Sequence, residues 1–190
     1  MKDEINKVAE ILGNGGVIAY PTDTLYGVGC DALNEKAIKR VYELKGRDFS
    51  KPMSIAVSDI KMLEKYVTIS AETKKMLNQI MPGPYTVLLP KKDSISNIVT
   101  AGSNLVGVRI PDYNLILKII KKFAKPIITT SANLSGEKDV IKYEDITLPV
   151  DYIIEGKCEY NQPSTVFDPI SKKILRKGVG FEKINKILIS

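Results

Sequence analysis

The stretch VIAYPTDTLYGVGCD, residues 17–31, passes from a short apolar run into a polar segment that begins at a proline. Residues 17–20 predict a buried strand, and the proline, aspartates and glycines that follow predict a loop over residues 21–31. The same change from apolar to polar occurs in PIITTSANLSGE, residues 126–137, and in LVGVRIPD, residues 105–112. Three such junctions indicate a sheet whose strands lead into polar loops.

Apolar residues at helical spacing separate these strands. In NEKAIKRVYELKG, residues 34–46, Asn34 is a candidate N-cap and Gly46 a candidate end of the helix. Other helices are predicted over residues 3–12, from Asp59, over about 70–80, over 112–123 with Asp112 in the first turn, and near 181–189, and other strands over 53–57, 85–90, 151–156, 164–168 and 173–178. Because some strands follow one another without a helix between them, the pattern predicts an α/β fold with a mixed sheet.

The chain has 190 residues, of which 44% are hydrophobic and 26% charged, and this composition is typical of one globular domain. No apolar run approaches the ~20 residues that a membrane-spanning helix needs, and the start MKDEINKVAE is unlike a signal peptide. Cys30 and Cys158 are far apart in the sequence, so we expect free thiols. These features predict a single domain over residues 1–190, in the cytoplasm and away from membranes.

The sequence contains no histidine. Ser-His-Asp triads, Cys-His pairs, histidine-ligated zinc and imidazole bases are therefore excluded. With only two cysteines, a structural zinc site is not expected either. The chain also lacks the G-x-x-x-x-G-K-[ST] motif, and GVGCDA does not complete G-x-G-x-x-G. Any chemistry must rely on lysine, arginine, hydroxyl groups, carboxylates, backbone amides and the substrates.

The net charge of +6 is concentrated in the middle third of the chain. Residues 61–130 contain 11 lysines and arginines against 4 acidic residues, whereas residues 1–60 contain 8 against 9 and residues 131–190 contain 9 against 9. A one-sided basic surface is what binding to a polyanion requires. Charge alone nevertheless favours a role in solubility, because many basic proteins bind no nucleic acid.

The segment KGRDFSKP, residues 45–52, gathers three cations at the predicted end of a helix. Lys45 and Arg47 either gain ~0.3–1 kcal/mol from the helix dipole or bind phosphates, and Lys51 is either surface charge or part of the same anion site. If this segment opens into the crevice formed by the three polar loops, its charge has an anion to meet, since ligands of open α/β sheets bind beyond the carboxyl ends of strands.

Other candidates also have two interpretations. Arg109 lies inside an apolar strand, so its guanidinium requires either an internal carboxylate or a bound anion. Ser131 and Asn133 are either turn residues or ligand contacts, and Ser164 with Thr165 by default opens a strand. Neither interpretation is decided by these residues alone.

Taken in order, GGVIAYPTDTLYGVGCDA, KGRDFSKPMSIAV, GPYTVLLP, GVRIPD, PIITTSANLSGE and PSTVFD followed by LRKG resemble the YrdC-like family of threonylcarbamoyl-AMP synthases. The resemblance runs from about residue 15 to 178 and is carried by the ordered set, since each motif is short. It implies an α/β fold with an open, twisted, mixed sheet flanked by helices, and a deep, positively charged cavity on one side. It also implies the single-domain branch of the family, without the second C-terminal domain of longer members.

The implied reaction joins L-threonine, bicarbonate or CO2, and ATP with Mg2+ into L-threonylcarbamoyl-AMP and pyrophosphate. A transferase protein then moves the threonylcarbamoyl group onto an adenosine of tRNA. No protein nucleophile or histidine is required, because charge placement and orientation catalyse such transfers. The resemblance implies no metal ligands from the protein, since ATP phosphates hold most of the Mg2+ coordination.

The resemblance also implies roles for particular residues. The expected ATP contacts are Lys45, Arg47, Lys51, Ser131, Asn133 and Arg176, with the first three as catalytic residues, and the expected threonine contacts are Thr24, Arg109, Thr129 and Ser164. Ala56 departs from the pattern, because many longer members have histidine there. The competing interpretations are a carbamoyl-adenylate module like that of hydrogenase maturation factors, and a non-catalytic module that binds double-stranded RNA, tRNA or the ribosome.

Overall fold

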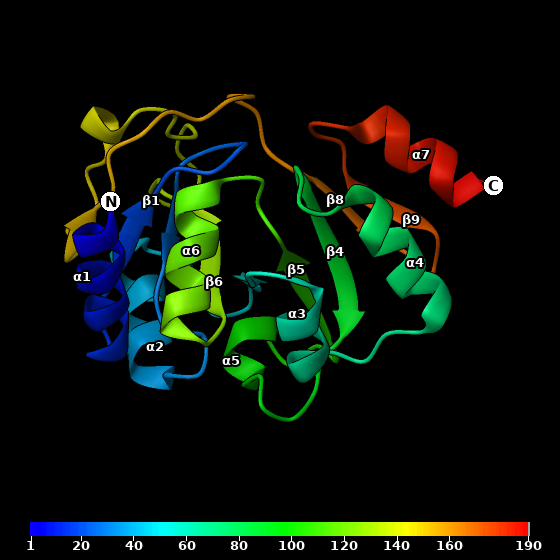
Figure 1. The fold of residues 1–190 in the computed structure, drawn as a ribbon, viewed down its shortest axis with the longest axis horizontal. Helices are drawn as coiled ribbons and strands as arrows, with labels where there is room; N and C mark the ends of the chain where they lie inside the picture. The colour runs from blue at the N-terminus through cyan, green and yellow to red at the C-terminus, as the bar shows by residue number, and fades with distance from the viewer. Residues whose placement is uncertain (190) are drawn as a thin grey trace.

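The computed structural model describes residues 1–189, and its central feature is a nine-stranded sheet in the order β7-β1-β2-β6-β3-β5-β4-β8-β9 (Figure 1). The strands are β1 Ile18–Tyr20, β2 Gly27–Gly29, β3 Ser54–Ala56, β4 Tyr85–Pro90, β5 Leu105–Arg109, β6 Ile127–Ser131, β7 Tyr152–Ile153, β8 Thr165–Asp168 and β9 Lys173–Arg176. The pairs β1–β7, β3–β5 and β4–β8 are parallel and the others antiparallel. The predicted open, mixed sheet is confirmed.

Helices flank this sheet, and each of them except α5 lies where the sequence predicts a helix. They are α1 Lys2–Gly13, α2 Glu35–Leu44, α3 Ile60–Tyr66, α4 Ala71–Ile80, α5 Asn97–Thr100, α6 Asn114–Phe123 and α7 Phe181–Ile189, with a 3-10 turn at Tyr143–Asp145. Asn34 caps α2 by accepting hydrogen bonds from the amides of Lys36 and Ala37, and Gly46 follows α2 with a φ of 54° that favours glycine. Both predicted helix boundaries are confirmed.

Two sequence predictions about elements are wrong. Asp112 does not lie in the first turn of α6, because residues 111–113 form a turn in which the Tyr113 amide donates to the Pro111 carbonyl, and the helix starts at Asn114. Residues 21–31 are not a loop throughout, since Gly27–Gly29 form β2 between β1 and β6. Pairing with the preceding strand β1 and with the distant strand β6 creates this strand, so the propensity of its own residues does not reveal it.

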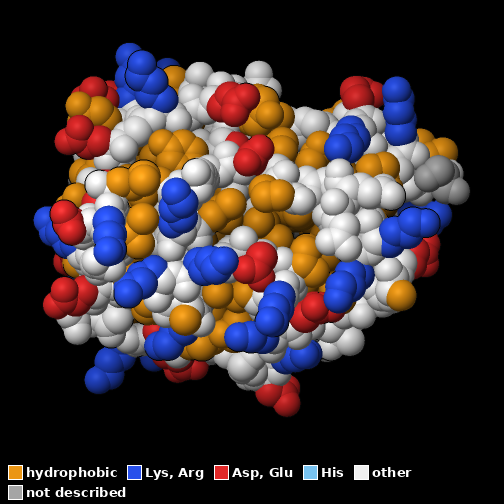
Figure 2. Space-filling model, viewed as in Figure 1, with side chains coloured by type: hydrophobic (Ala, Val, Ile, Leu, Met, Phe, Trp, Pro, Cys, Tyr) orange, Lys and Arg blue, Asp and Glu red, His pale blue; other side chains and the backbone are white. Residues whose placement is uncertain are grey.

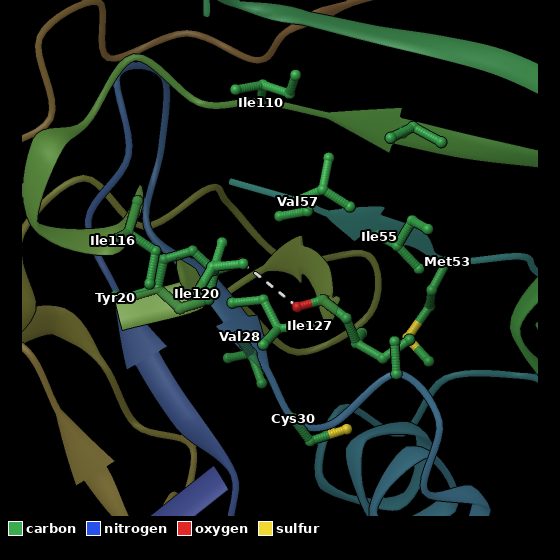
Figure 3. Packing of buried hydrophobic residues seen from close by; sticks show 14 of the residues in the cluster. Tyr20, Val28, Cys30, Met53, Ile55, Val57, Ile110, Ile116, Ile120 and Ile127 are labelled. Atoms are coloured by element: carbon green, nitrogen blue, oxygen red, sulfur yellow. Dashed lines mark hydrogen bonds between the residues drawn. The ribbon is translucent and has the colours of Figure 1, made fainter. Parts of the chain in front are cut away.

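The hydrophobic core fixes the strands that later carry the site. Figure 3 shows Ile116 and Ile120 of α6 beside Tyr20 of β1, all three fully buried. The Tyr20 hydroxyl donates to the Ile128 carbonyl at 3.3 Å, and burial raises its pKa to about 12. Figure 1 shows α1 beside α6, and the two helices are in contact. This packing holds β1, β2 and β6 in one rigid unit.

The outer surface carries charges of both signs. Figure 2 shows lysine and arginine side chains spread among acidic ones over the visible face, without a single basic patch on it. Within residues 1–189, no helix combines the length and the apolar character needed to cross a membrane.

Candidate active site

The register of the sheet places a row of polar side chains on one face. Ser54 of β3 is opposite Thr129 of β6 on one side and Gly107 of β5 on the other. Side chains alternate between faces along a strand, so Arg109, two residues after Gly107, lies on this same face. A Cβ atom at Gly107 would lie 2.4 Å from Ser54 Oγ, and the missing side chain therefore keeps the centre of the row open.

This row forms the floor of a cavity of about 210 Å3. Chain segments distant in sequence line it: Thr22, Thr24, Leu25, Tyr26, Gly27, Arg47, Pro52, Met53, Ser54, Thr86, Arg109, Thr129, Thr130, Ser131, Asp139, Pro163, Ser164, Val166 and Arg176. The lining thus includes three arginines and several hydroxyl groups, with Asp139 as the one carboxylate contributed by residues 1–189. Its charge and hydrogen-bonding groups suit a ligand that is anionic and polar.

The structure brings the three strand-to-loop junctions together, but for a different reason from the one expected from the sequence. β1 and β6 run in the same direction, because each pairs antiparallel with β2, whereas β5 runs opposite to β6. Their carboxyl ends therefore do not share one edge of the sheet. Cross-strand register, and the length of the arginine side chain, place Arg109 in the cavity with the other two junctions.

Arg109 has an internal carboxylate partner. Its Nη2 donates to Asp23 Oδ1 at 2.9 Å, and the Asp23 side chain is fully buried. Burial raises the pKa of Asp23, while the charge of Arg109 opposes that rise. Asp23 Oδ2 and Arg109 Nε are buried without a hydrogen-bond partner among residues 1–189. The ion pair therefore has one hydrogen bond and leaves one polar atom of each residue without a partner among residues 1–189. The role of Arg109 in binding a substrate carboxylate stays a prediction.

Arg47 lines the cavity from the loop after α2. Its Nε donates to the Lys51 carbonyl at 3.1 Å and its Nη2 to the Pro52 carbonyl at 2.7 Å. A guanidinium has five N–H groups. The Nε and Nη2 groups that donate to these two carbonyls hold the arginine side chain and its loop together. Burial lowers the pKa of Arg47, which shows that its charge is only partly solvated.

Arg176 and Ser164 are connected at the opposite wall of the cavity. Arg176 Nε donates to the Ser164 carbonyl at 3.0 Å, and its Nη2 donates to Ser164 Oγ at 2.9 Å. Ser164 Oγ also shares a 2.9 Å hydrogen bond with Thr86 Oγ1. Burial lowers the pKa of Arg176, and the positive charge of Arg109 adds to this effect. As predicted by default, the residue after Ser164, Thr165, opens a strand.

Lys45 is buried behind the cavity surface, with 1% of the residue exposed. Its Nζ donates to the carbonyls of Ser131 and Asn133, the second at 2.5 Å. Ser131 lines the cavity, and its Oγ donates to Asn133 Oδ1 at 2.5 Å. Burial, with the nearby charge of Arg47, lowers the pKa of Lys45 to about 8. The ammonium therefore holds the chain at the end of β6 through the carbonyls of Ser131 and Asn133. Its contact with a phosphate stays a prediction.

The remaining predicted residues occupy different positions. Thr24 and Thr129 line the cavity, with Thr24 Oγ1 3.0 Å from Thr22 Oγ1. The cavity surface contributed by residues 1–189 does not include Lys51, whose side chain is exposed. Ala56 is 1% exposed on β3, opposite Arg109 in the register. Their roles in binding ATP or threonine stay predictions.

Sequence reasoning missed several polar cavity residues, among them Thr22, Ser54, Thr86, Thr130 and Asp139, and it missed Asp23 as the partner of Arg109. Asp23 stands within PTDTLYG, and a buried arginine predicted in its neighbourhood was a signal that an acidic partner was needed. Thr86 and Asp139 gave no such signal, because threonine is common in strands and aspartate in loops.

The chain shares its open mixed sheet flanked by helices with solved structures of one class of proteins. The Sua5/YciO/YrdC family model, described as Telomere recombination, matches residues 10–178. The chain therefore belongs to the Sua5/YciO/YrdC family.

Individual relatives include named synthases and a structure with a bound amino acid. A protein of Methanocaldococcus jannaschii is 40% identical, with 98% of this chain and 92% of the relative covered. The threonylcarbamoyl-AMP synthase of Vibrio campbellii is 34% identical over 90% of this chain and 97% of its own length. The crystal structure of P. abyssi Sua5 complexed with L-threonine is 33% identical with a TM-score of 0.93. The alignment covers 98% of this chain but only 58% of the P. abyssi chain.

Proposed function

We propose that this chain is an L-threonylcarbamoyladenylate synthase, a nucleotidyltransferase that forms L-threonylcarbamoyl-AMP and pyrophosphate from L-threonine, bicarbonate or CO2, and ATP. The observation that carries the proposal is the convergence of Arg47, Arg109 and Arg176 with hydroxyl side chains in one cavity. The name of the Vibrio campbellii relative and the threonine complex of P. abyssi Sua5 support the choice of substrate.

The proposed reaction balances without a protein nucleophile. The threonine amine adds to the carbon of CO2 and loses a proton, which gives a carbamate. A carbamate oxygen then attacks the α-phosphorus of ATP, the bond from that phosphorus to the bridging oxygen breaks, and pyrophosphate leaves. In this proposal Arg47 and Arg176 bind the phosphates of ATP, and Arg109 binds the threonine carboxylate. The hydroxyl groups of Thr24, Thr129 and Ser164 surround the amino acid. Orientation and preorganised charge supply the catalysis.

The side chains available to Mg2+ fit an ion that is held mainly by ATP. No group of three or more acidic or cysteine side chains suited to a metal occurs in residues 1–189, and Asp139 is the carboxylate on the cavity surface of that region. Mg2+ binds readily through one or two carboxylates together with substrate phosphates. When bound, the ion neutralises charge on the triphosphate.

The proposal includes further partners. The product passes to a threonylcarbamoyl-transferase protein that modifies tRNA, and tRNA or other double-stranded RNA can contact this chain directly. The two cysteines are free and buried, which suits a reducing compartment such as the cytoplasm. A non-catalytic RNA-binding role is not favoured, because the Vibrio campbellii relative at 34% identity is named as a synthase.

The test measures pyrophosphate release by the pure protein with ATP, Mg2+, bicarbonate and each amino acid in turn. We expect release that requires both threonine and bicarbonate. Release that is independent of threonine would remove the proposed substrate, and RNA binding without any release would support the non-catalytic role.

Arg47→Ala tests the phosphate wall of the cavity. Because this side chain both lines the cavity and fixes the loop of Lys51 and Pro52, we expect pyrophosphate release to fall by a factor of about 100 or more. Unchanged release would contradict the assignment of Arg47 to the triphosphate.

A further inference from the structure

The side chains of the Lys-x-Arg and Ser-x-Asn motifs separate into two pairs in the structure. Arg47 and Ser131 line the cavity, whereas Lys45 and Asn133 are 1% and 7% exposed behind that surface. We propose that Lys45 and Asn133 are positioning residues, which hold the segment 131–137 so that Ser131 faces the substrate, and that neither is a ligand of the triphosphate. The identity of that substrate rests on the proposed function, whereas the contacts themselves do not.

The donors of the Lys45 ammonium are already engaged. Nζ donates to the carbonyls of Ser131 and Asn133, and Asn133 Oδ1 is a third acceptor at 3.4 Å. An ammonium has three N–H donors, so these three acceptors match its full capacity. A phosphate oxygen would therefore have to displace an acceptor that belongs to the loop.

Further hydrogen bonds fix the same segment along its length. The Ser135 amide donates to the Lys45 carbonyl at 2.8 Å, so Lys45 holds the segment through its backbone as well as its side chain. Asn133 Nδ2 donates to the Glu137 carbonyl at 2.7 Å, while Asn133 Oδ1 accepts from Ser131 Oγ. Asn133 thus connects the cavity residue at the start of the segment to the residue at its end.

The helix before Lys45 gives this arrangement a rigid base. Lys45 is the C-cap of α2, and Val41 and Tyr42 in the last turns of that helix are buried in the core. The Ser131 segment is consequently fixed to the core through α2. Burying an ammonium on neutral carbonyls costs free energy, which the loop must offset through its other contacts. Such a buried charge is more typical of a functional site than of a passive core.

Hydrogen exchange of the protein without nucleotide tests this positioning directly. In Lys45→Met we expect the amides of residues 132–137, and that of Ser135 in particular, to exchange at least ~10-fold faster, because the segment loses the side chain that holds two of its carbonyls. Lys39→Met is the matched control, since Lys39 lies exposed on the same helix. Unchanged exchange in Lys45→Met would overturn the proposal. If that variant does not fold, Asn133→Ala replaces it, with faster exchange expected at residues 134–137 and unchanged exchange again contradicting the proposal.

A double-variant cycle on ATP affinity separates positioning from direct contact. If Lys45 acts through Ser131, the two substitutions are not independent. The Kd for ATP of the double variant Lys45→Met with Ser131→Ala should then be at most about threefold higher than that of whichever single variant binds ATP less tightly. Losses that multiply would show two independent ligands and overturn the proposal. If the unmodified protein binds no ATP, the proposed function fails, while the exchange experiment still decides whether Lys45 holds the segment.

Discussion

At the scale of single residues, Arg109 and Arg47 line one cavity through different bonding arrangements. Arg109 Nη2 donates to the buried Asp23 carboxylate, whereas Arg47 donates to two carbonyls of its own loop. Asp23 therefore fixes one edge of the Arg109 guanidinium and leaves Nε without a partner among residues 1–189. This difference gives the two arginines different expected effects on the two substrates.

Arg109→Lys retains the positive charge but removes the planar fork that pairs with a carboxylate. Loss of one charge-assisted hydrogen bond costs about 1.5–3 kcal/mol, so we expect the KM for threonine to rise by about 10- to 100-fold and the KM for ATP to stay within about twofold. Steady-state pyrophosphate release with each substrate varied measures both values. Arg47→Lys is the matched control and should raise the KM for ATP instead. An equal rise of both KM values in Arg109→Lys would contradict the assignment to threonine.

Lys45 gives the free energy of unfolding a pH dependence of definite sign. Its pKa is about 8 in the folded protein and 10.5 for an ordinary lysine, with burial as the main cause. Between these values the unfolded chain holds a proton that the folded chain has lost, so stability rises with pH. The measurement is urea unfolding at pH 7.5, 9 and 10. Between the lowest and the highest pH, the free energy of unfolding of the unmodified protein should rise relative to that of Lys45→Met by up to on the order of 3 kcal/mol. A difference that does not change with pH would contradict this expectation.

At the scale of secondary structure, the chain around Gly178 brings β9 close to the segment before β8. A Cβ atom at Gly178 would lie 2.2 Å from the Pro163 carbonyl oxygen and 2.6 Å from backbone atoms of Ser164. Backbone atoms cannot rotate away as the end of a side chain can. This contact explains the glycine of the LRKG motif and connects it to Ser164, which bonds Arg176 in the cavity.

Gly178→Ala is therefore expected to displace Ser164 and with it one wall of the cavity. Overpacking of this kind costs about 1–3 kcal/mol, and pyrophosphate release should fall by more than stability alone explains. Gly13→Ala is the control, because a Cβ atom there meets nothing within 4 Å and the substitution should be neutral or slightly stabilising. Chemical unfolding and the release assay measure the two effects. Retention of full activity by Gly178→Ala would show that the wall adapts.

Local signals predicted most elements but not those defined by distant partners. Asn34 caps α2 as the sequence indicated, because capping depends on residues within one turn. Strand β2 was missed because two of its three residues, Gly27 and Gly29, have low strand propensity, and the segment forms a strand by pairing with β1 and β6.

The same distinction applies to the candidate site. The position of Arg109 in an apolar strand was enough to predict that it needed a partner, but the choice of Asp23 depends on how the loop after β1 folds. The cations of residues 45–51 were predicted as a group, and the structure separates them. Arg47 faces the cavity, Lys45 faces the loop behind it, and Lys51 is exposed. The sequence shows that the three cations are close together along the chain, whereas the direction in which each side chain points depends on three-dimensional packing.

At the scale of the whole molecule, both halves of the sheet contribute to the cavity. Ser131 comes from β6 and Arg47 from the loop that precedes β3, while Ser164 and Arg176 belong to the β8–β9 side, with β5 and β4 between them (Figure 1). A ligand that contacts both walls binds only when the two halves are folded together. Ligand binding and the stability of the entire sheet are consequently linked.

This linkage predicts a thermal shift of known size. ATP with Mg2+ at about 100 times its Kd should stabilise the fold by about 2.7 kcal/mol, which corresponds to a rise in Tm of about 5–10 °C for a chain of this length. We expect a single unfolding transition by calorimetry, because the cavity walls come from both halves of one sheet. Adenosine at the same concentration should give a much smaller shift, since it lacks the phosphate groups that we propose Arg47 and Arg176 bind. An equal shift with adenosine would contradict that recognition, and a shift produced by duplex RNA but not by ATP would move the binding function from the cavity to the outer surface.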